Sequence, residues 1–221
     1  MYCLPLVLLW NFKMEFQIEK KVYAKFIFHY DKIKMNSFLH QINQYSPLSK
    51  EAASDFLSKL KSQSYKKGEL ITKEGQVCKQ LYFIETGLVK QYYHHNDRLF
   101  VLRFFSENNI CTTLDSFLKQ SPADFMTVAL EDTTLVFIDY EDVQQLAKNH
   151  HSFETFLRKI FSLAALTLLN RIKEMFNNDA SGLYESFTKN NSHLLQRISL
   201  GDIASYIGVS QVTLSRIRAK Q

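Results

Sequence analysis

The sequence predicts an α+β protein: an antiparallel β-roll of jelly-roll type, then a long helix, then a C-terminal all-α helix-turn-helix domain. Short β-branched and aromatic runs between turns fill residues 65–139, and a helical pattern with two apolar stripes spans residues 152–176. The last residues have the spacing of two short helices around a glycine. With 221 residues, 46% of them hydrophobic, the chain is long enough for one large or two modest globular domains.

These patterns divide the chain into four segments. The first mixes aromatic and charged residues without clean periodicity, so either translation begins at Met35 or this stretch forms an extra docked helix. Its apolar run is far shorter than the ~20 residues of a membrane helix, and it lacks the basic start of a signal peptide. The predicted bounds are 1–34 for this extension, 35–150 for the β-roll, 151–177 for the long helix and 178–221 for a helix-turn-helix domain without a β-wing.

Composition and cysteine content narrow the class of protein. The chain has 27 Lys and Arg against 22 Asp and Glu, a net charge of +5, which suits an anionic partner such as nucleic acid but is also common among other proteins. The 3 cysteines are odd in number, far apart and without metal-ligand spacing, so no disulfide framework, zinc ribbon or iron–sulfur cluster is expected. We predict a cytoplasmic protein with no metal, no cofactor and no membrane contact.

The β-roll is predicted from the runs between residues 65 and 139. Apolar runs such as 81–84 and 99–105 are separated by glycines and polar groups, with no long helix between them, which is typical of an antiparallel sandwich or barrel. Helices are expected on both sides of it, one capped by Ser49 and a short one at 140–147.

The long helix carries two apolar stripes, each with the 4-3-4-3 spacing. One contains Phe161, Ala165, Leu168, Ile172 and Met175, and the other contains Phe153, Leu157, Ile160, Ala164 and Thr167. Since a surface helix needs only one stripe, this helix has two packing partners, and the coiled-coil spacing suggests that one is the same helix of a second subunit. Burial within one monomer is the alternative. The predicted dimerisation residues are Phe153, Leu157, Ile160, Phe161, Ala164 and Leu168.

Residues 198–218 have the residue types that a helix-turn-helix requires. Gly208 stands where the chain reverses and a positive φ is favoured, Ala204 is small where the two helices approach closely, and Ser210 caps the second helix. A helical hairpin that merely packs is the alternative. The apolar residues expected between the helices are Ile203, Ile207, Val209, Leu214 and Ile217.

The outward side of the second helix has residue types that bind base edges and phosphates. Residues 197–221 contain one acidic residue, Asp202, and four basic residues: Arg197, Arg216, Arg218 and Lys220. Anion-seeking charge is therefore concentrated in this segment. The predicted DNA-binding residues are Ser210, Gln211, Val212, Thr213, Ser215, Arg216, Arg218 and Lys220.

This arrangement resembles the Crp/Fnr family of bacterial transcription regulators over about residues 36–221. The specific marks are Gly68-Glu69-Leu70-Ile71, Gly75, Leu81-Tyr82-Phe83-Ile84-x-x-Gly87 and the terminal Ile-Gly-Val-Ser-x-x-Thr-Leu-Ser-Arg. The resemblance implies that the roll senses an effector as a domain of the cyclic-nucleotide-binding type, that the long helix joins two subunits, and that helix 211–219 lies in the DNA major groove. Ser210, Gln211, Thr213 and Arg216 fall on positions that touch DNA in the family.

The sequence departs from the family at the phosphate site. The family's cyclic-nucleotide binders hold the phosphate with a Gly-Glu pair and, ten residues after the Glu, an Arg followed by Ser or Thr. The matching positions here hold Thr112 and Thr113, then Ala123 and Asp124, so a buried phosphate would meet no cation. The effector is therefore unknown and cyclic AMP is not expected. Val212 also replaces an acidic residue that many members use on cytosine. The predicted effector pocket contains Thr112, Thr113, Leu114, Ala123 and Asp124.

The sequence gives little support to the hypothesis that this protein is an enzyme. A metal-dependent cupin needs converging histidines, and the adjacent pair His94-His95 would point to opposite faces of a strand. Cys111 near the expected pocket could act as a thiol sensor, but a small buried hydrophobe is the commoner role. We therefore expect no enzyme activity.

The sequence favours a homodimeric regulator that reads two half-sites about one helical turn apart on double-stranded DNA, with RNA polymerase as a candidate further partner. Arg216 is expected to make the main base or phosphate contact, Gln211 and Thr213 to tune sequence preference, and Arg218 and Lys220 to hold phosphates. The alternative is a non-enzymatic sensing or interaction protein with a vestigial helix-turn-helix.

Overall fold

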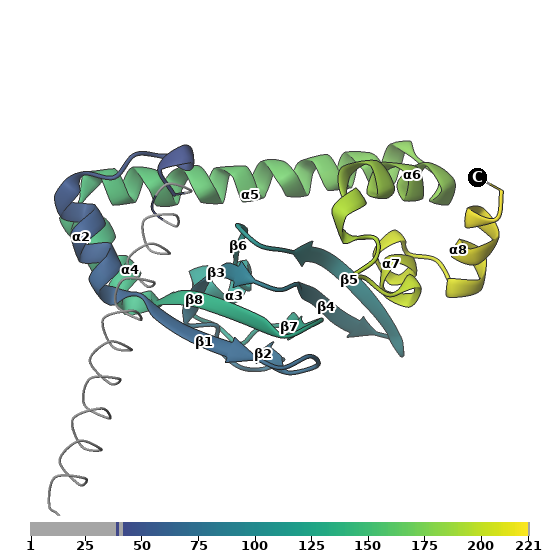
Figure 1. The fold of residues 1–221 in the computed structure, drawn as a ribbon, viewed down its shortest axis with the longest axis horizontal. Coiled ribbons are helices and arrows are strands. Elements are labelled where there is room, and N and C mark those ends of the chain that lie inside the picture. Colours follow the sequence, from purple (N-terminus) through teal and green to yellow (C-terminus); the bar gives the residue numbers. More distant parts are fainter. Residues whose placement is uncertain (1–38, 40–41, 221) are drawn as a thin grey trace, which may run out of the picture. The chain divides into compact units, whose positions relative to one another are not determined.

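The structure is a computed structural model that describes residue 39 and residues 42–220 (Figure 1). The predicted extension 1–34 therefore lies outside the described residues. The chain divides into two compact units, with the boundary between Tyr45 and Ser46. In the first unit, residues 42–45 are helical. The second unit contains the strands and all the helices discussed below.

Within the described residues, eight short strands form two four-stranded antiparallel sheets, as the short β-branched and aromatic runs predicted. One sheet has the order β1-β8-β3-β6 and the other has the order β2-β7-β4-β5. The first sheet consists of β1 (Lys61–Tyr65), β8 (Thr133–Asp139), β3 (Gln80–Thr86) and β6 (Ile110–Cys111). The second consists of β2 (Leu70–Thr72), β7 (Met126–Ala129), β4 (Val89–His95) and β5 (Arg98–Phe105). The predicted α+β class with an antiparallel roll is confirmed.

Strands β4 and β5 form a hairpin with a two-residue turn at Asn96 and Asp97. Both residues have positive φ, 49° and 59°, in the left-handed region that Asn and Asp tolerate and that two-residue hairpins require. The register pairs Lys90 with Phe104 and Tyr92 with Val101. Lys90 and Tyr92 are alternate residues of β4 and share a face, and a bulge between Gln91 and Tyr92 brings their partners Phe104 and Val101, three positions apart in β5, to that same face.

Helices that precede and follow the strands in the chain share an aromatic core with the first sheet. Ser49 caps α2 (Lys50–Lys59), as predicted, by accepting a hydrogen bond from the Ala52 amide. Phe56 of this helix lies 6.0 Å from Phe83 of β3 and 5.4 Å from Phe153, measured between ring centroids. The other two helices of this part of the chain are α3 (Leu114–Lys119) and α4 (Tyr140–Asn149).

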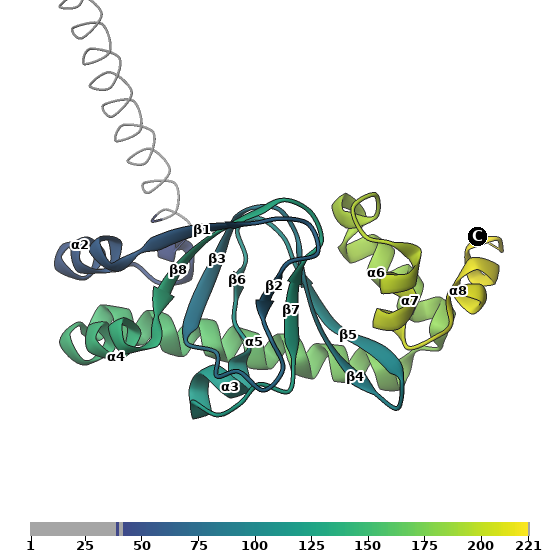
Figure 2. The same ribbon diagram turned by 90° about the horizontal axis from the view of Figure 1, so that it is seen from below.

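The long helix α5 (His151–Asn177) runs from α4 past the strands toward the last helices (Figures 1 and 2). One side of its first half is buried within the chain, and most of its second half is exposed. Its buried residues are Phe153, Phe156, Leu157 and Ile160. Its exposed large apolar residues are Leu163, Leu166, Leu168, Leu169, Ile172, Met175 and Phe176.

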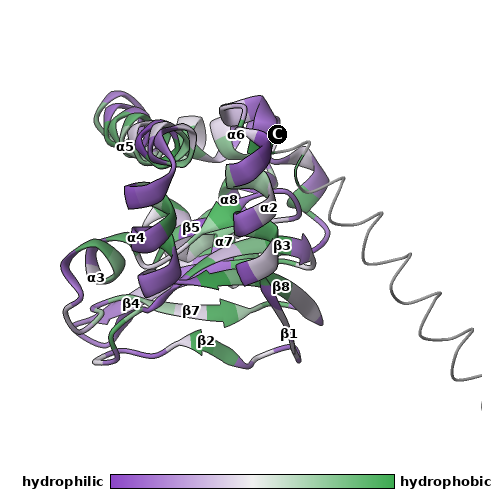
Figure 3. Cartoon of the chain, turned by 90° about the vertical axis from the view of Figure 1, so that its left-hand side faces the viewer, coloured by the Kyte–Doolittle hydropathy of each residue, from purple (hydrophilic) through white to green (hydrophobic). Residues whose placement is uncertain are grey.

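This division corrects the predicted dimerisation residues. Phe153, Leu157 and Ile160 are covered by the chain itself and are not available to a second subunit. Phe161 and Ala164 are half-buried, and Leu168 is exposed. When the chain is coloured by hydropathy, green apolar residues appear along α5 as well as in the sheets (Figure 3).

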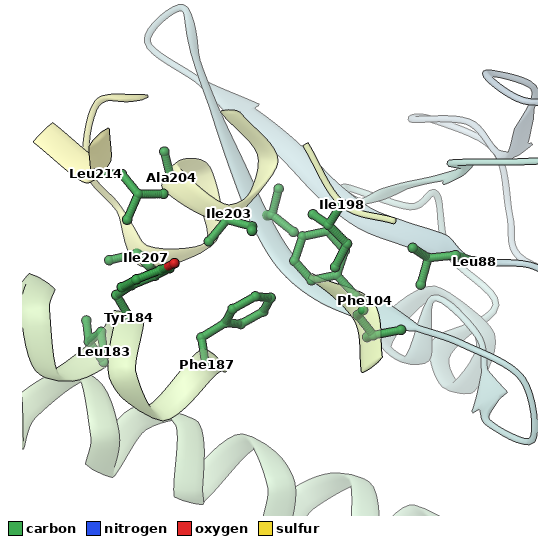
Figure 4. Close-up of a cluster of buried hydrophobic side chains, with 12 residues drawn as sticks. Leu88, Phe104, Leu183, Tyr184, Phe187, Ile198, Ile203, Ala204, Ile207 and Leu214 are labelled. Carbon is green, nitrogen blue, oxygen red and sulfur yellow. The ribbon is translucent and has the colours of Figure 1, made fainter. Parts of the chain in front are cut away.

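Three helices and a short 3-10 turn complete the chain. They are α6 (Ala180–Asn190), η1 (Ser192–Leu194), α7 (Leu200–Ile207) and α8 (Gln211–Arg218). Their apolar side chains share one buried cluster with Leu88, Val101 and Phe104 of the roll (Figure 4). Residues 180–220 are called the helical unit below.

Candidate nucleic-acid interface

Both short helices of the pair α7 and α8 begin at a serine cap. The Ser199 hydroxyl accepts a hydrogen bond from the Asp202 amide at 3.0 Å, and the Ser210 hydroxyl accepts one from the Thr213 amide at 3.1 Å. Such caps satisfy amides that have no partner inside the helix and typically stabilise it by about 1 kcal/mol. The predicted capping role of Ser210 is thus confirmed.

The turn between α7 and α8 is built around Gly208. Its φ is +91°, in the left-handed region that glycine adopts without strain, and the amides of Gly208 and Val209 both donate to the Ala204 carbonyl. Ala204 is buried, and Leu214 of α8 is 0% exposed. The small residue, the glycine and the inward leucine therefore occupy the places that the sequence pattern assigned to them.

The outward side of α8 is open to solvent. All eight residues predicted to bind DNA are exposed: Ser210, Gln211, Val212, Thr213, Ser215, Arg216, Arg218 and Lys220. No acidic residue follows Asp202 in the chain, so the positive charges of Arg216, Arg218 and Lys220 are not opposed from within this segment. The geometry presents hydroxyl, amide and guanidinium groups on one short helix, which suits contacts with bases and phosphates.

Arg197, counted above among the anion-seeking residues, is already bound within the chain. Its Nη1 and Nη2 donate to the two carboxylate oxygens of Glu107 at 3.0 and 2.8 Å. Its Nη2 and Nε also donate to Glu131 at 2.5 and 3.3 Å. The Gly87 amide donates to Glu107 as well, at 2.9 Å. The charge left for a ligand is therefore that of Arg216, Arg218 and Lys220.

These contacts keep both sides of the Arg197 pair ionised. Burial by itself raises the pKa of Glu107, but hydrogen bonds from Arg197, from its own backbone and from the Gly87 amide, together with the charge of Arg197, lower it to about 2. Hydrogen bonds to Glu131 and then to Glu107 raise the pKa of Arg197 further above its ordinary value. The carboxylate of Glu107 is thus charged throughout the physiological pH range.

Two more polar contacts fix α7. Lys90 of β4 pairs with Asp202 at 2.5 Å, and both side chains are largely buried. Arg171 of α5 donates to the Tyr206 carbonyl at 2.6 Å, and its guanidinium carbon lies 4.0 Å from the centroid of the Tyr206 ring. Sequence reasoning missed these partners, because each joins residues that are far apart in the chain and no local pattern marks them.

Three of the predicted effector residues, Thr112, Thr113 and Leu114, lie at the start of α3, and Ala123 and Asp124 follow its end, but the five do not form one exposed group. Thr113 and Ala123 are buried, Thr112 and Leu114 are half-buried, and Asp124 is exposed. The Thr112 hydroxyl donates to the Gln80 carbonyl at 2.9 Å. The Gln91 amide donates to the Thr112 carbonyl and the Thr113 hydroxyl at 3.4 Å each.

Cys111 and the pair His94-His95, weighed above for sensing and for metal binding, both lie in the roll. Cys111 is buried, and this burial raises its pKa well above the ordinary value of a thiol, so it stays protonated and acts as a small apolar residue. His94 and His95 are exposed near the hairpin tip. Within the described residues, no group of three or more His, Cys, Asp or Glu side chains could hold a metal ion. No helix among those residues is long and apolar enough to cross a membrane.

The roll matches one family profile, and the chain is similar in fold to several solved structures. Residues 62–150 match the family profile of the cyclic nucleotide-binding domain. No curated protein matches the chain. A mutant of CooA from Carboxydothermus hydrogenoformans is similar with a TM-score of 0.61 and 19% identity, over 75% of this chain and 77% of CooA.

Two further solved structures are similar to the same extent. FixK2 from Bradyrhizobium japonicum has a TM-score of 0.62 and 20% identity, over 73% of this chain and 83% of FixK2. A protein described as a transcriptional regulator of the Crp/Fnr family, from Eubacterium rectale, has a TM-score of 0.65 and 16% identity, over 80% of this chain and 87% of that one.

Residues 62–150, which include strands of both sheets, match the cyclic nucleotide-binding domain, and a long helix and a helical C-terminal unit follow them. The fold as a whole is similar to those of CooA, FixK2 and the regulator described as Crp/Fnr, which confirms the fold that the resemblance implied.

Proposed function

We propose that this protein is a homodimeric, cytoplasmic regulator that binds double-stranded DNA and is not an enzyme. The observation that carries the proposal is the outward side of α8, where every predicted contact residue is exposed while Leu214 anchors the helix from behind. In a helix-turn-helix, the second helix enters the major groove and its exposed residues touch base edges and phosphates. The similarity of the fold to Crp/Fnr regulators supports the same role.

The proposed second subunit covers the second half of α5. Large apolar side chains of a monomer are not normally left exposed in such a long contiguous stretch, and here they include Leu169 at 60% and Phe176 at 86% exposure. Phe161, Ala165, Leu168 and Ile172 keep the 4-3-4 spacing of a coiled-coil seam, which favours the same helix of a second copy as the partner. Two copies of α8 then read two half-sites about one helical turn apart.

We propose that the roll does not bind cyclic AMP in the way of the family's cyclic-nucleotide binders. Ala123 is buried without a polar group to offer, and Asp124 brings a negative charge where the family has Ser or Thr. A cation does lie in this sheet, at Arg103 opposite Gln91, but its guanidinium is placed over the Phe105 ring at 4.8 Å. Calorimetric titration with cyclic AMP is expected to show no binding, and micromolar binding contradicts this proposal.

Arg216→Ala tests the DNA-binding role. Binding sites are first selected from a random duplex pool with the wild-type protein, and the affinities of both proteins are then measured by fluorescence anisotropy at low salt. We expect the variant to bind about 5- to 150-fold more weakly, since one good Arg contact to a base contributes about 1–3 kcal/mol.

Lys119→Ala is the matched control, because it removes one exposed positive charge from α3 of the roll, away from α8. It is expected to bind the selected duplex nearly as well as the wild type. If the wild-type protein binds no duplex at low salt, the proposal fails and the alternative, a sensing or interaction protein with a vestigial helix-turn-helix, is preferred.

A further inference from the structure

The helical unit is docked on the roll through an apolar seam. Phe104 of β5 lies 6.0 Å from Phe187 of α6 and 5.7 Å from Tyr206 of α7, measured between ring centroids. Ile198 and Ile203 belong to the same buried cluster, and their side chains lie beside Phe104 (Figure 4). The helical unit is therefore in direct contact with the second sheet as well as being joined to α5.

An ionic cluster lies just before α7 in this unit. Arg197 lies two residues before the cap of α7. It forms ion pairs with Glu107, in the turn after β5, and with Glu131, in the turn before β8. Gly87, in the turn between β3 and β4, donates its amide to the same Glu107. We call Arg197, Glu107 and Glu131 the clamp. Two turns of the roll thus bind one side chain of the helical unit, and a third turn holds Glu107.

The docking leaves the proposed DNA-binding face free. The clamp uses Arg197, and the Lys90 and Arg171 contacts use Asp202 and Tyr206, all before the turn at Gly208. None of the eight exposed residues on the outward side of α8 takes part in these contacts. A docked helical unit is therefore held in one orientation with its α8 face accessible to a duplex.

We propose that Arg197 is a positioning residue for DNA binding: its clamp to Glu107 and Glu131 holds the helical unit against the roll in the orientation that a duplex binds. This inference rests on the proposed function. An element held in its binding orientation loses less conformational freedom on binding than a loose one, so releasing the clamp weakens DNA binding although no DNA contact is removed. The Arg197 side chain is only 26% exposed and is committed to the two carboxylates, so it is poorly placed to take a phosphate.

Removing a negative charge from the clamp separates this proposal from a general effect of net charge, because the two predict opposite changes in DNA affinity. Replacing Glu131 with Gln makes the protein more positive, so if only net charge matters, DNA binding becomes tighter. If the clamp positions the helical unit, the same change makes DNA binding weaker. Asp132→Asn is the matched control, because Asp132 is the next residue, carries the same charge and pairs with Lys66 on the exposed surface.

The experiment measures duplex affinity of the full-length chain as wild type, Glu107→Gln, Glu131→Gln and Asp132→Asn at several salt concentrations. Amide hydrogen exchange of residues 200–218 is followed in the same proteins without DNA. We expect about three- to tenfold weaker binding for both Glu variants, with an unchanged slope of affinity against salt, because no phosphate contact is lost. We also expect faster exchange in α7 for these variants and not for Asp132→Asn.

Equal or tighter DNA binding by Glu131→Gln overturns the proposal, and so does unchanged exchange in α7. If the wild-type protein binds no duplex, the proposed function fails by itself. Exchange then decides whether the clamp holds the helical unit: faster exchange in the two Glu variants supports the clamp, and exchange equal to that of the wild type overturns it.

Discussion

Leu169→Glu is expected to turn the dimer into a monomer and to abolish binding to a two-half-site operator. Leu169 is 60% exposed in the middle of the apolar second half of α5. Leu169 directly follows Leu168 of the proposed coiled-coil seam, so in a dimer paired along this helix the change places a carboxylate from each subunit at the edge of an apolar interface, and burying unpaired charges costs several kcal/mol. Linked binding of two half-sites typically gains a factor of about 10²–10⁴ over one, and the monomer loses this factor. Light scattering coupled to gel filtration measures the mass.

Leu118→Glu serves as the control for this prediction. Leu118 is 51% exposed, close to Leu169, but it lies on α3 rather than on α5. The variant adds the same charge to the same residue type and is expected to stay dimeric and to bind DNA. A dimeric Leu169→Glu protein excludes the second half of α5 as the subunit interface.

Gly87→Ala is expected to destabilise the roll by about 2–5 kcal/mol, measured as the free energy of unfolding in guanidinium chloride. Gly87 has a φ of +103°, and a Cβ at this position would lie 2.7 Å from the backbone Cα of Thr133. The positive φ costs a residue with a side chain about 1–2 kcal/mol. Forcing two backbone segments apart adds an overpacking cost of about 1–3 kcal/mol.

Gly68→Ala separates the two costs. Gly68 also has a positive φ, +87°, but no atom lies within 4 Å of the place its Cβ would take. It is therefore expected to lose only about 1–2 kcal/mol, the conformational part alone. Equal losses in the two variants would show that the approach of Thr133 to Gly87 contributes nothing.

Local patterns carried the prediction of the elements. The serine caps at Ser49 and Ser210, the turn glycine Gly208 and the inward Leu214 are where their spacing placed them. The same is true of the exposed residues on the outward side of α8, since a helix with one anchored apolar side must present the rest to solvent. The candidate nucleic-acid interface was thus accessible from some twenty residues of sequence.

The division of α5 could not be predicted in the same way. Two stripes with identical spacing indicate two packing partners, but spacing does not say which partner covers which residues. The structure shows that α5 changes its environment along its length: Phe153 packs on Phe56, while Leu169 is left exposed. Three of the residues predicted for the subunit interface consequently belong to the core of the chain.

By itself the sequence determined the order of roll, long helix and terminal helix pair, together with the caps and the turn of that pair, because each depends on residues within a few positions of one another. Only the tertiary structure decided that Arg197 is bound to the roll instead of being available to DNA. Its partners Glu131 and Glu107 lie 66 and 90 positions away in the chain. A charge meets such a partner only through the packing of whole elements, so no local pattern of residues encodes the contact.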